Sequence, residues 1–243
     1  MLLRITLNSD TAPSTTKTLG GMTVTSSAID EPSLKVEKLA SPRYTRPILD
    51  TPQTITVINA ASMQQQNLLS LTDVLSTVPG ITFGAGEGGG GYGDSINLRG
   101  YAASNDITVD GVRDSAQYTR SDTFNIEQVE VANGANSVFN GSGSVGGTIN
   151  LVSKAARAED FANLTDGLGS DSYYRATVDA NHQLADDVAF RLNGMWHQND
   201  VAGRKVESFE RWGIAPSISI GLDGPTSATL SYFHQEDDNI PLY

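Results

Sequence analysis

Apolar and polar residues alternate along the second half of the chain with a period of two. Each alternating segment has one apolar face and one face rich in arginine, asparagine, serine or histidine. This period predicts β-strands whose two faces meet different surroundings. Such strands suit a barrel wall between lipid and a wet lumen, and an ordinary soluble antiparallel sheet is the alternative. The segments are 173–182, 188–199, 211–222 and 228–235, with a weaker first member at 161–169.

Two arginines and two tryptophans favour the membrane wall over the soluble sheet. Arg191 and Arg211 fall on matching polar faces, whereas Trp196 and Trp212 fall on apolar faces. Tryptophan is favoured where a membrane wall meets lipid headgroups. We therefore expect the segments after residue 155 to be antiparallel strands of a transmembrane β-barrel.

The region before these strands carries shorter elements of mixed type. Alternation at 54–58 predicts a strand, and Asn59 can cap a helix over 60–69. A second short helix over 71–78 stops at Pro79-Gly80. Together these elements predict a compact α+β module with a small mixed sheet. Brief strands are expected at 81–83, 96–98, 107–109, 126–131 and 148–152.

Residues 8–53 are rich in Ser, Thr and Pro and lack sustained periodicity, so they are expected to form a flexible arm. Within the arm, residues 22–28 contain β-formers. This patch either pairs with another strand or is plain linker.

Two glycine-rich stretches have different predicted roles. The run from Gly141 to Gly147 lies between two strands, so we expect backbone to pack tightly against backbone there. The loop 84–93 contains a formal G-x-G-x-x-G. More glycine and then a strand follow it, where a dinucleotide site needs a helix N-terminus. We expect a mobile, exposed loop and no nucleotide site.

Composition excludes several classes of function. The net charge is −12, which argues against nonspecific nucleic-acid binding. Cysteine is absent, so disulfides and thiolate metal sites are excluded. The three histidines lack ligand spacing, and no serine lies in a G-x-S-x-G motif. We expect no metal site and no enzyme. No run of about 18 apolar residues exists, and 1–8 make a poor signal peptide.

Six stretches, taken in order, resemble the TonB-dependent outer-membrane receptors. The Val-Asp-Gly-Val-Arg-Asp loop and the first alternating segments are similar to ferric-siderophore receptors, with the catecholate branch nearest. The resemblance implies an arm over 1–50, a plug domain over 51–154 and the first four or five barrel strands over 155–243. The six stretches are 50–57, 71–81, 96–100, 107–113, 124–131 and 143–152.

The chain departs from the family pattern in two turns and in length. Asn133-Gly134-Ala135 stands where relatives carry Lys/Arg-Gly-Pro, and 139–143 replaces Tyr-Gly-Arg-Gly. These changes remove basic residues that relatives use between plug and barrel. Plugged transporters have about 22 strands, so we expect this chain to be an N-terminal portion of a receptor or a truncated product.

The resemblance implies a transport cycle in the bacterial outer membrane. A ferric siderophore binds at plug apices and barrel loops. The arm's TonB box then pairs as a strand with the C-terminal domain of TonB, part of the TonB-ExbB-ExbD system. The receptor hydrolyses nothing, and iron is carried only as the chelate, so no cofactor is implied. The expected TonB box lies within 22–28, with Met22, Thr23, Val24, Thr25 and Ser26 as its residues.

Ferric catecholates are anionic and flat-faced, so their site needs arginine and aromatic groups. The expected plug share is Tyr92, Arg113, Gln117, Tyr118 and Arg120. Alternatively, the loop 112–123 is simply solvated, and Arg113 pairs with Asp110 or Asp114. Arg99 is expected to be a buried, paired structural arginine. Gly100, Asp110, Gly111, Gly146 and Gly147 are also expected to be structural.

Three other functions stay open at this point. The chain could belong to a receptor of the same architecture for another ligand, such as cobalamin or a glycan. It could be a soluble, non-transporting interaction module with a plug and a stub of sheet. A nucleotide-binding enzyme built on 84–89 is the third.

Overall fold

A computed structural model describes most of the chain, as two compact units that meet in sequence between Lys154 and Ala155. One unit contains 33–154 with 240–243, and the other contains 1–32 with 155–239. Within residues 2–27, only the backbone of the described strands is considered. The described residues are 2–8, 14–19, 22–27, 34, 36, 39–41, 44, 46–84, 95–103, 106–113, 122–135, 145–201, 203 and 206–240.

The unit 33–154 is built on a five-stranded mixed sheet with the order β4-β10-β11-β8-β9, which we call the plug sheet. All neighbours are antiparallel except β11 and β8, which run parallel. A separate three-stranded sheet has the order β5-β6-β7. The strands of the plug sheet are β4 (Ile55–Asn59), β8 (Ile107–Val109), β9 (Val112–Arg113), β10 (Ile126–Asn133) and β11 (Gly147–Ser153). Those of the second sheet are β5 (Ile81–Phe83), β6 (Ile96–Leu98) and β7 (Tyr101–Ala102).

Two short helices follow β4, and their caps explain where they begin. The Asn59 side chain accepts from Ser62 N at the start of α1 (Ala60–Gln65). A capping box between Ser70 and Asp73, which was not among the features predicted from the sequence, starts α2 (Leu71–Ser76). The expected helix over 60–69 is too long, because Asn67 turns into the left-handed region at φ 53°. Two 3₁₀ turns, η1 (Ile48–Asp50) and η3 (Thr123–Asn125), complete the unit.

An aliphatic core joins the helices to the sheets of this unit. Its members come from alternate positions of the strands and one face of each helix, as period-2 and period-3.6 patterns require. The side chains with no more than 1% exposure are Val74, Leu75, Ile96, Leu98, Val129, Val131 and Ile149. The strands expected at 81–83, 96–98, 107–109, 126–131 and 148–152 are thus confirmed.

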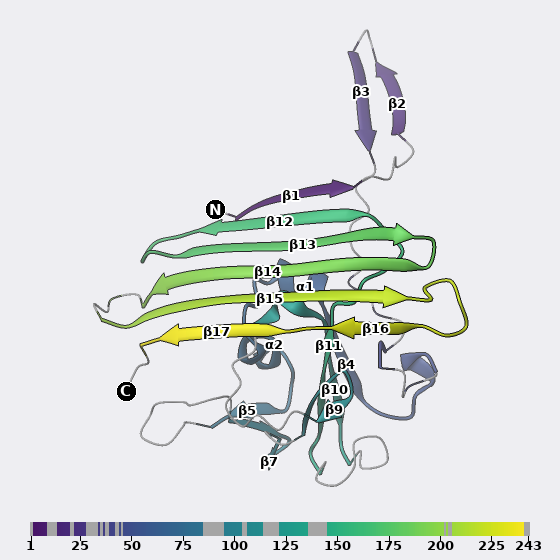
Figure 1. The fold of residues 1–243 in the computed structure, drawn as a ribbon. Helices are drawn as coiled ribbons and strands as arrows, with labels where there is room; N and C mark the ends of the chain where they lie inside the picture. Colours follow the sequence, from purple (N-terminus) through teal and green to yellow (C-terminus); the bar gives the residue numbers. More distant parts are fainter. Residues whose placement is uncertain are drawn as a thin grey trace. The chain divides into compact units, whose positions relative to one another are not determined.

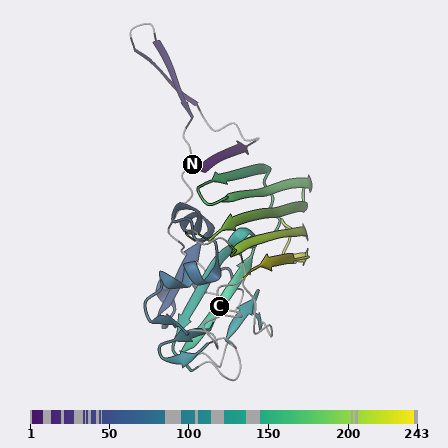
Figure 2. The same ribbon diagram turned by 90° about the vertical axis from the view of Figure 1, so that its left-hand side faces the viewer.

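The other unit is one antiparallel sheet whose strand order follows the sequence from β12 onward. Figures 1 and 2 show it as a continuous row from purple β1 to yellow β17. β15 pairs with β16 near one end and with β17 near the other. The strands are β1 (Leu2–Asn8), β12 (Phe161–Leu168), β13 (Tyr174–Ala185), β14 (Val188–Asp200), β15 (Ser208–Ile220), β16 (Ala228–Ser231) and β17 (His234–Asn239).

The two faces of this sheet are inverted relative to a soluble sheet. Its large apolar side chains are exposed, including Phe190, Trp196 and Ile218, whereas Arg191 and Asn193 on the other face are 3% and 0% exposed. The expected strand over 228–235 is wrong in detail, because the chain breaks between β16 and β17 at Tyr232 and Phe233. The other four alternating segments are confirmed as antiparallel strands of an incomplete β-barrel.

The N-terminal residues also form strands. β2 (Ser14–Leu19) and β3 (Met22–Ser27) pair as a hairpin, with Lys17 opposite Val24. β1 pairs antiparallel with β12, from Leu2 opposite Gly167 to Asn8 opposite Phe161. In the part of the chain that is described, no helix has the length and apolarity needed to cross a bilayer.

Candidate functional site

A tight hairpin between β8 and β9 carries the one expected ligand-binding residue that is described. Asp110 and Gly111 form its turn with φ of 49° and 79°, as a two-residue hairpin with left-handed central residues requires. The Asp110 carboxylate accepts from Ser153 N at 2.8 Å, and Gly111 N donates to Asn150 Oδ1 at 3.0 Å. Both contacts tie the hairpin to β11.

Arg113 ends β9 with 39% of its side chain exposed. Its Nη2 lies 3.8 Å from Oδ1 of Asp106, a carboxylate that is only 5% exposed. The partners expected from sequence were Asp110 or Asp114 instead; Asp114 lies outside the described residues. The guanidinium therefore lies beside a buried carboxylate, while part of the Arg113 side chain reaches solvent.

The rest of the expected ligand site lies outside the described residues. This applies to Tyr92, Gln117, Tyr118 and Arg120, and to most of the glycine loop 84–93. Of the expected TonB box, Met22 to Ser26, the backbone is described, and it forms β3 opposite β2. The expected box is therefore already in strand conformation.

The residues expected to be structural divide into two kinds. A Cβ on Gly146 would lie 2.2 Å from the Leu98 carbonyl oxygen, and one on Gly147 would lie 2.3 Å from that of Ala132. Backbone does pack against backbone there. Arg99 is exposed, so the expected burial is wrong. The reason is that Arg99 and Gly100 form the left-handed corner between β6 and β7, so Arg99 belongs to a turn and not to a buried strand end.

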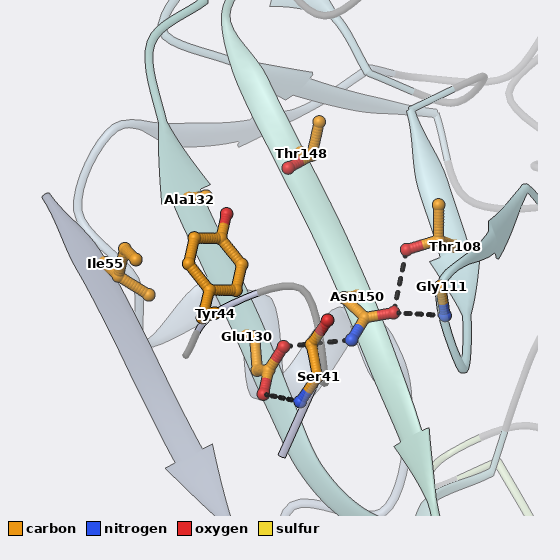
Figure 3. A pocket seen from close by; sticks show the side chains of 9 residues that line it. All are labelled: Ser41, Tyr44, Ile55, Thr108, Gly111, Glu130, Ala132, Thr148 and Asn150. Carbon is orange, nitrogen blue, oxygen red and sulfur yellow. Dashed lines mark hydrogen bonds between the residues drawn. The ribbon is translucent and has the colours of Figure 1, made fainter. Parts of the chain in front are cut away.

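A buried polar network crosses the middle of the plug sheet (Figure 3). Thr108, Asn150 and Glu130 are register neighbours on β8, β11 and β10. Asn150 donates to Glu130 Oε2 at 2.9 Å and accepts from Thr108 Oγ1 at 2.8 Å. Glu130 Oε1 also accepts from Gln128 Nε2 at 2.7 Å. The Glu130 carboxylate is 3% exposed and is satisfied by these donors.

Two further donors to Glu130 come from the N-terminal side of the plug. Ala40 N and Ser41 N donate to Oε1 at 2.8 and 3.3 Å. Ser41 and Tyr44 then line a small pocket together with the sheet residues of the network (Figure 3). Glu130 is not among the functional residues predicted from the sequence. The available signal was a carboxylate and an amide, Glu130 and Gln128, on one face of a strand whose other face is Val129 and Val131.

A second polar network fixes the connector after the plug. The Asn181 side chain accepts from Arg157 N at 3.0 Å and donates to the carbonyls of Arg157 and Glu159. Arg191 donates to Ala155 O at 3.0 Å and holds Asp179 through two bonds of 2.8 and 2.9 Å. Arg191 is buried within the sheet unit and its charge is paired, as a low-exposure arginine requires.

Asp160 in the same connector has a lowered pKa. The main cause is the hydrogen bond from Gln183 N, at 2.7 Å, and the contact with His182 Nδ1 at 3.0 Å also lowers the pKa, while partial desolvation opposes both. Across the described residues, no three acidic or histidine side chains gather in a metal-binding arrangement. The networks above hold chain segments in place, and the half-exposed Arg113 is a group that an anionic ligand can reach.

A comparison with family models places this geometry in a known class. Residues 47–148 match the model for the TonB-dependent receptor plug domain. The matched range spans both sheets of the unit 33–154, from η1 to the start of β11. This region is therefore similar to the plug domain of the TonB-dependent receptors. The residues after this match complete β11 and continue into the sheet with its exposed apolar face.

Curated relatives cover nearly the whole chain. It is 43% identical over 220 residues to the probable TonB-dependent siderophore receptor PiuA of Acinetobacter baumannii, which covers 90% of this chain and 30% of PiuA. It is 39% identical over 207 residues to the catecholate siderophore receptor Fiu of Escherichia coli K12, which covers 84% of this chain and 27% of Fiu. The chain thus spans less than a third of these relatives.

Solved structures of the same two receptors resemble the fold. The PiuA crystal structure matches with a TM-score of 0.82 at 43% identity, over 87% of this chain and 30% of that chain. The closed form of the ferric-catecholate import receptor Fiu matches with a TM-score of 0.80 at 39% identity, over 86% and 30%. The plug and the first barrel strands are therefore built as they are in siderophore receptors.

Proposed function

We propose that this chain forms the plug and first barrel strands of an outer-membrane receptor that imports a ferric siderophore of the catecholate type. The carrying observation is the 39–43% identity to siderophore receptors across both units. An anionic, aromatic chelate suits a plug that presents a half-exposed arginine at the end of a rigid hairpin. Iron enters as the chelate, and the chain itself catalyses no reaction and holds no cofactor.

The ligand half of this proposal is tested by direct binding. The full 243-residue chain, purified in detergent, is incubated with a ferric tris-catecholate, the iron-free chelator or a ferric hydroxamate, and retained iron is measured after ultrafiltration. The ferric catecholate is expected to be retained most strongly. Arg113→Gln should weaken its retention several-fold, and Arg113→Lys less so, because lysine keeps the charge but loses the planar fork.

Three results would contradict this assignment. Equal retention of catecholate and hydroxamate would remove the catecholate preference. Retention of cobalamin or a glycan in place of either chelate would identify a receptor of the same architecture for another ligand. Monomeric behaviour of the chain in the absence of detergent would favour the non-transporting module.

The partner half concerns β3. We propose that Met22 to Ser26 are the TonB box and pair with the TonB C-terminal domain by strand addition. Successive N–H groups of a strand point to opposite edges, so Thr23→Pro and Val24→Pro remove donors from different edges. We expect one of the two to abolish binding of the TonB domain in biolayer interferometry and the other to weaken it less. Unchanged binding by both variants would place the TonB contact elsewhere.

A further inference from the structure

The backbone of residues 39–41 is held on the plug sheet by a buried carboxylate. Leu39 and Ser41 are 6% and 7% exposed, and they flank an exposed Ala40. The N–H groups of Ala40 and Ser41 both donate to Glu130 Oε1. These bonds span about ninety residues of sequence, so they join the end of the N-terminal region to the centre of the sheet. We name residues 39–41 the strap.

We propose that the strap is a releasable latch, seated by Glu130 and opened without unfolding the plug. Hydrogen bonds to a carboxylate are roughly twice as strong as neutral ones, which favours the seated state. Yet among the described residues the strap pairs with no strand of the plug sheet, whose order is β4-β10-β11-β8-β9. Its release therefore leaves the strand ladders intact and uncovers the pocket that Ser41 and Tyr44 line (Figure 3).

Asn150 is the positioning residue of this latch. It directs its amide N–H at Glu130 Oε2, and its own Oδ1 is fixed by Thr108 Oγ1 and Gly111 N. This fixes the amide orientation, so position 130 must present an acceptor on both sides. Glutamate does so, whereas glutamine would turn its NH₂ group toward either Asn150 or the strap. The latch thus depends on a side chain at position 130 whose two oxygens both accept hydrogen bonds.

The absence of cysteine from the chain makes thiol labelling a direct test. Ser41→Cys places a buried thiol in the strap, Ala40→Cys gives an exposed reference, and Val74→Cys, at 0% exposure, reports unfolding of the core. Labelling by a maleimide is followed in the full chain in detergent. Adding Glu130→Gln should speed labelling of the strap thiol about 10- to 100-fold, as loss of charge-assisted bonds predicts, and leave the core thiol unlabelled.

A second variant restores the donor and acceptor pattern. In Glu130→Gln/Asn150→Asp, the glutamine NH₂ can donate to the aspartate, whose other oxygen accepts from Thr108 and Gly111. The carbonyl oxygen of the glutamine stays available to accept from the strap. We expect protection of the thiol in Ser41→Cys to return toward that seen with the parent Glu130 and Asn150. Failure of this rescue would overturn the role given to Asn150.

Other outcomes would overturn the latch itself. If Glu130→Gln leaves the labelling rate of the strap thiol unchanged, the carboxylate does not seat the strap. Parallel exposure of the strap thiol and the core thiol would show unfolding of the plug in place of strap release. In a receptor that TonB pulls at its N-terminal region, the latch would be the first part of the plug that the pull reaches. This use of the latch rests on the proposed function. The labelling experiment contains no TonB and no siderophore, so its failure leaves that function intact.

Discussion

Asp160 shows at the residue scale how the connector depends on pH. Its folded pKa lies below the ordinary value of 3.8, chiefly because Gln183 N donates to the carboxylate. A carboxyl whose pKa is lowered by folding contributes stability above its unfolded pKa and loses that contribution as the pH falls through the folded pKa. The connector should therefore hold at neutral pH and loosen only in acid below about pH 4.

The Asp160 carbon chemical shift should titrate with a midpoint below 3.8 in an NMR experiment on selectively labelled protein. Gln183→Pro removes the N–H donor and should raise the midpoint more than His182→Ala, because the backbone bond is the larger cause. Gln183→Ala keeps the N–H and serves as control, with no change expected. A larger rise from His182→Ala than from Gln183→Pro would contradict this order of causes.

Single polar residues are the hardest feature to predict from sequence. Arg113 can be predicted as a ligand-binding candidate, because a charged residue in a polar loop suggests ligand contact. Its ion pair with Asp106 cannot be predicted, because only the folded hairpin brings the two residues together. The signal at Glu130 is weaker, because polar residues that alternate with valines along a strand are also typical of a solvated strand face. Only the structure shows that donors from β11 and from residues 40–41 surround it.

At the scale of elements, strand positions followed from the sequence because alternation records which side chains are buried. The limits of elements did not, since caps and left-handed residues such as Asn67 decide them. The break between β16 and β17 had no clear sequence signal, because Tyr232 and Phe233 are themselves good strand formers. The sequence predicted that backbone packs closely against the glycines between the two strands. It did not predict that the backbones at Leu98 and Ala132 are the partners.

Gly147 provides the test at this scale. Its φ is 144°, and a Cβ would overlap the Ala132 carbonyl oxygen, so Gly147→Ala should destabilise the plug by about 2–5 kcal/mol through overpacking and backbone strain. Gly100→Ala is the matched control. It has φ of 84° but nothing within 4 Å of the added methyl, so we expect only about 1–2 kcal/mol from the left-handed backbone.

Hydrogen exchange of the slowest plug amides measures both variants, because a chain of two units has no single unfolding midpoint. The amides of Val131 and Ile149 lie in the core strands and report opening of the whole plug. Equal losses for the two variants would show that backbone strain alone, without close approach to Leu98 and Ala132, determines the requirement for glycine at position 147.

At the scale of the whole molecule, the sheet after the plug presents apolar side chains to its surroundings. Cross-strand neighbours extend this face over several strands, with Trp196 opposite Trp212 and Phe190 opposite Ile218. A contiguous exposed apolar patch on a protein surface marks an interaction site. A lipid bilayer is the surrounding that fits a sheet with polar groups on its other face and aromatic rings near the strand ends.

Leu230 and Thr229 are adjacent on β16 and point to opposite faces, which makes them a matched pair for testing contact with lipid. Both are exposed, and Leu230 lies opposite Ile218 on the apolar face. In vesicles with brominated acyl chains, the fluorescence of Trp196 and Trp212 should be quenched. Leu230→Lys should reduce that quenching, at a cost of up to about 2–4 kcal/mol for a cation in the hydrocarbon.

Thr229→Lys should leave the quenching close to that of the parent, because its side chain lies on the polar face next to Ser219. Two results would contradict a lipid-facing surface. One is quenching that Leu230→Lys leaves unchanged, and the other is an equal loss from both lysine variants. The two lysine variants probe the two faces of one strand. They therefore distinguish a membrane wall from a sheet whose apolar side is covered by protein. In the second case, bromine on the acyl chains would not reach the tryptophans.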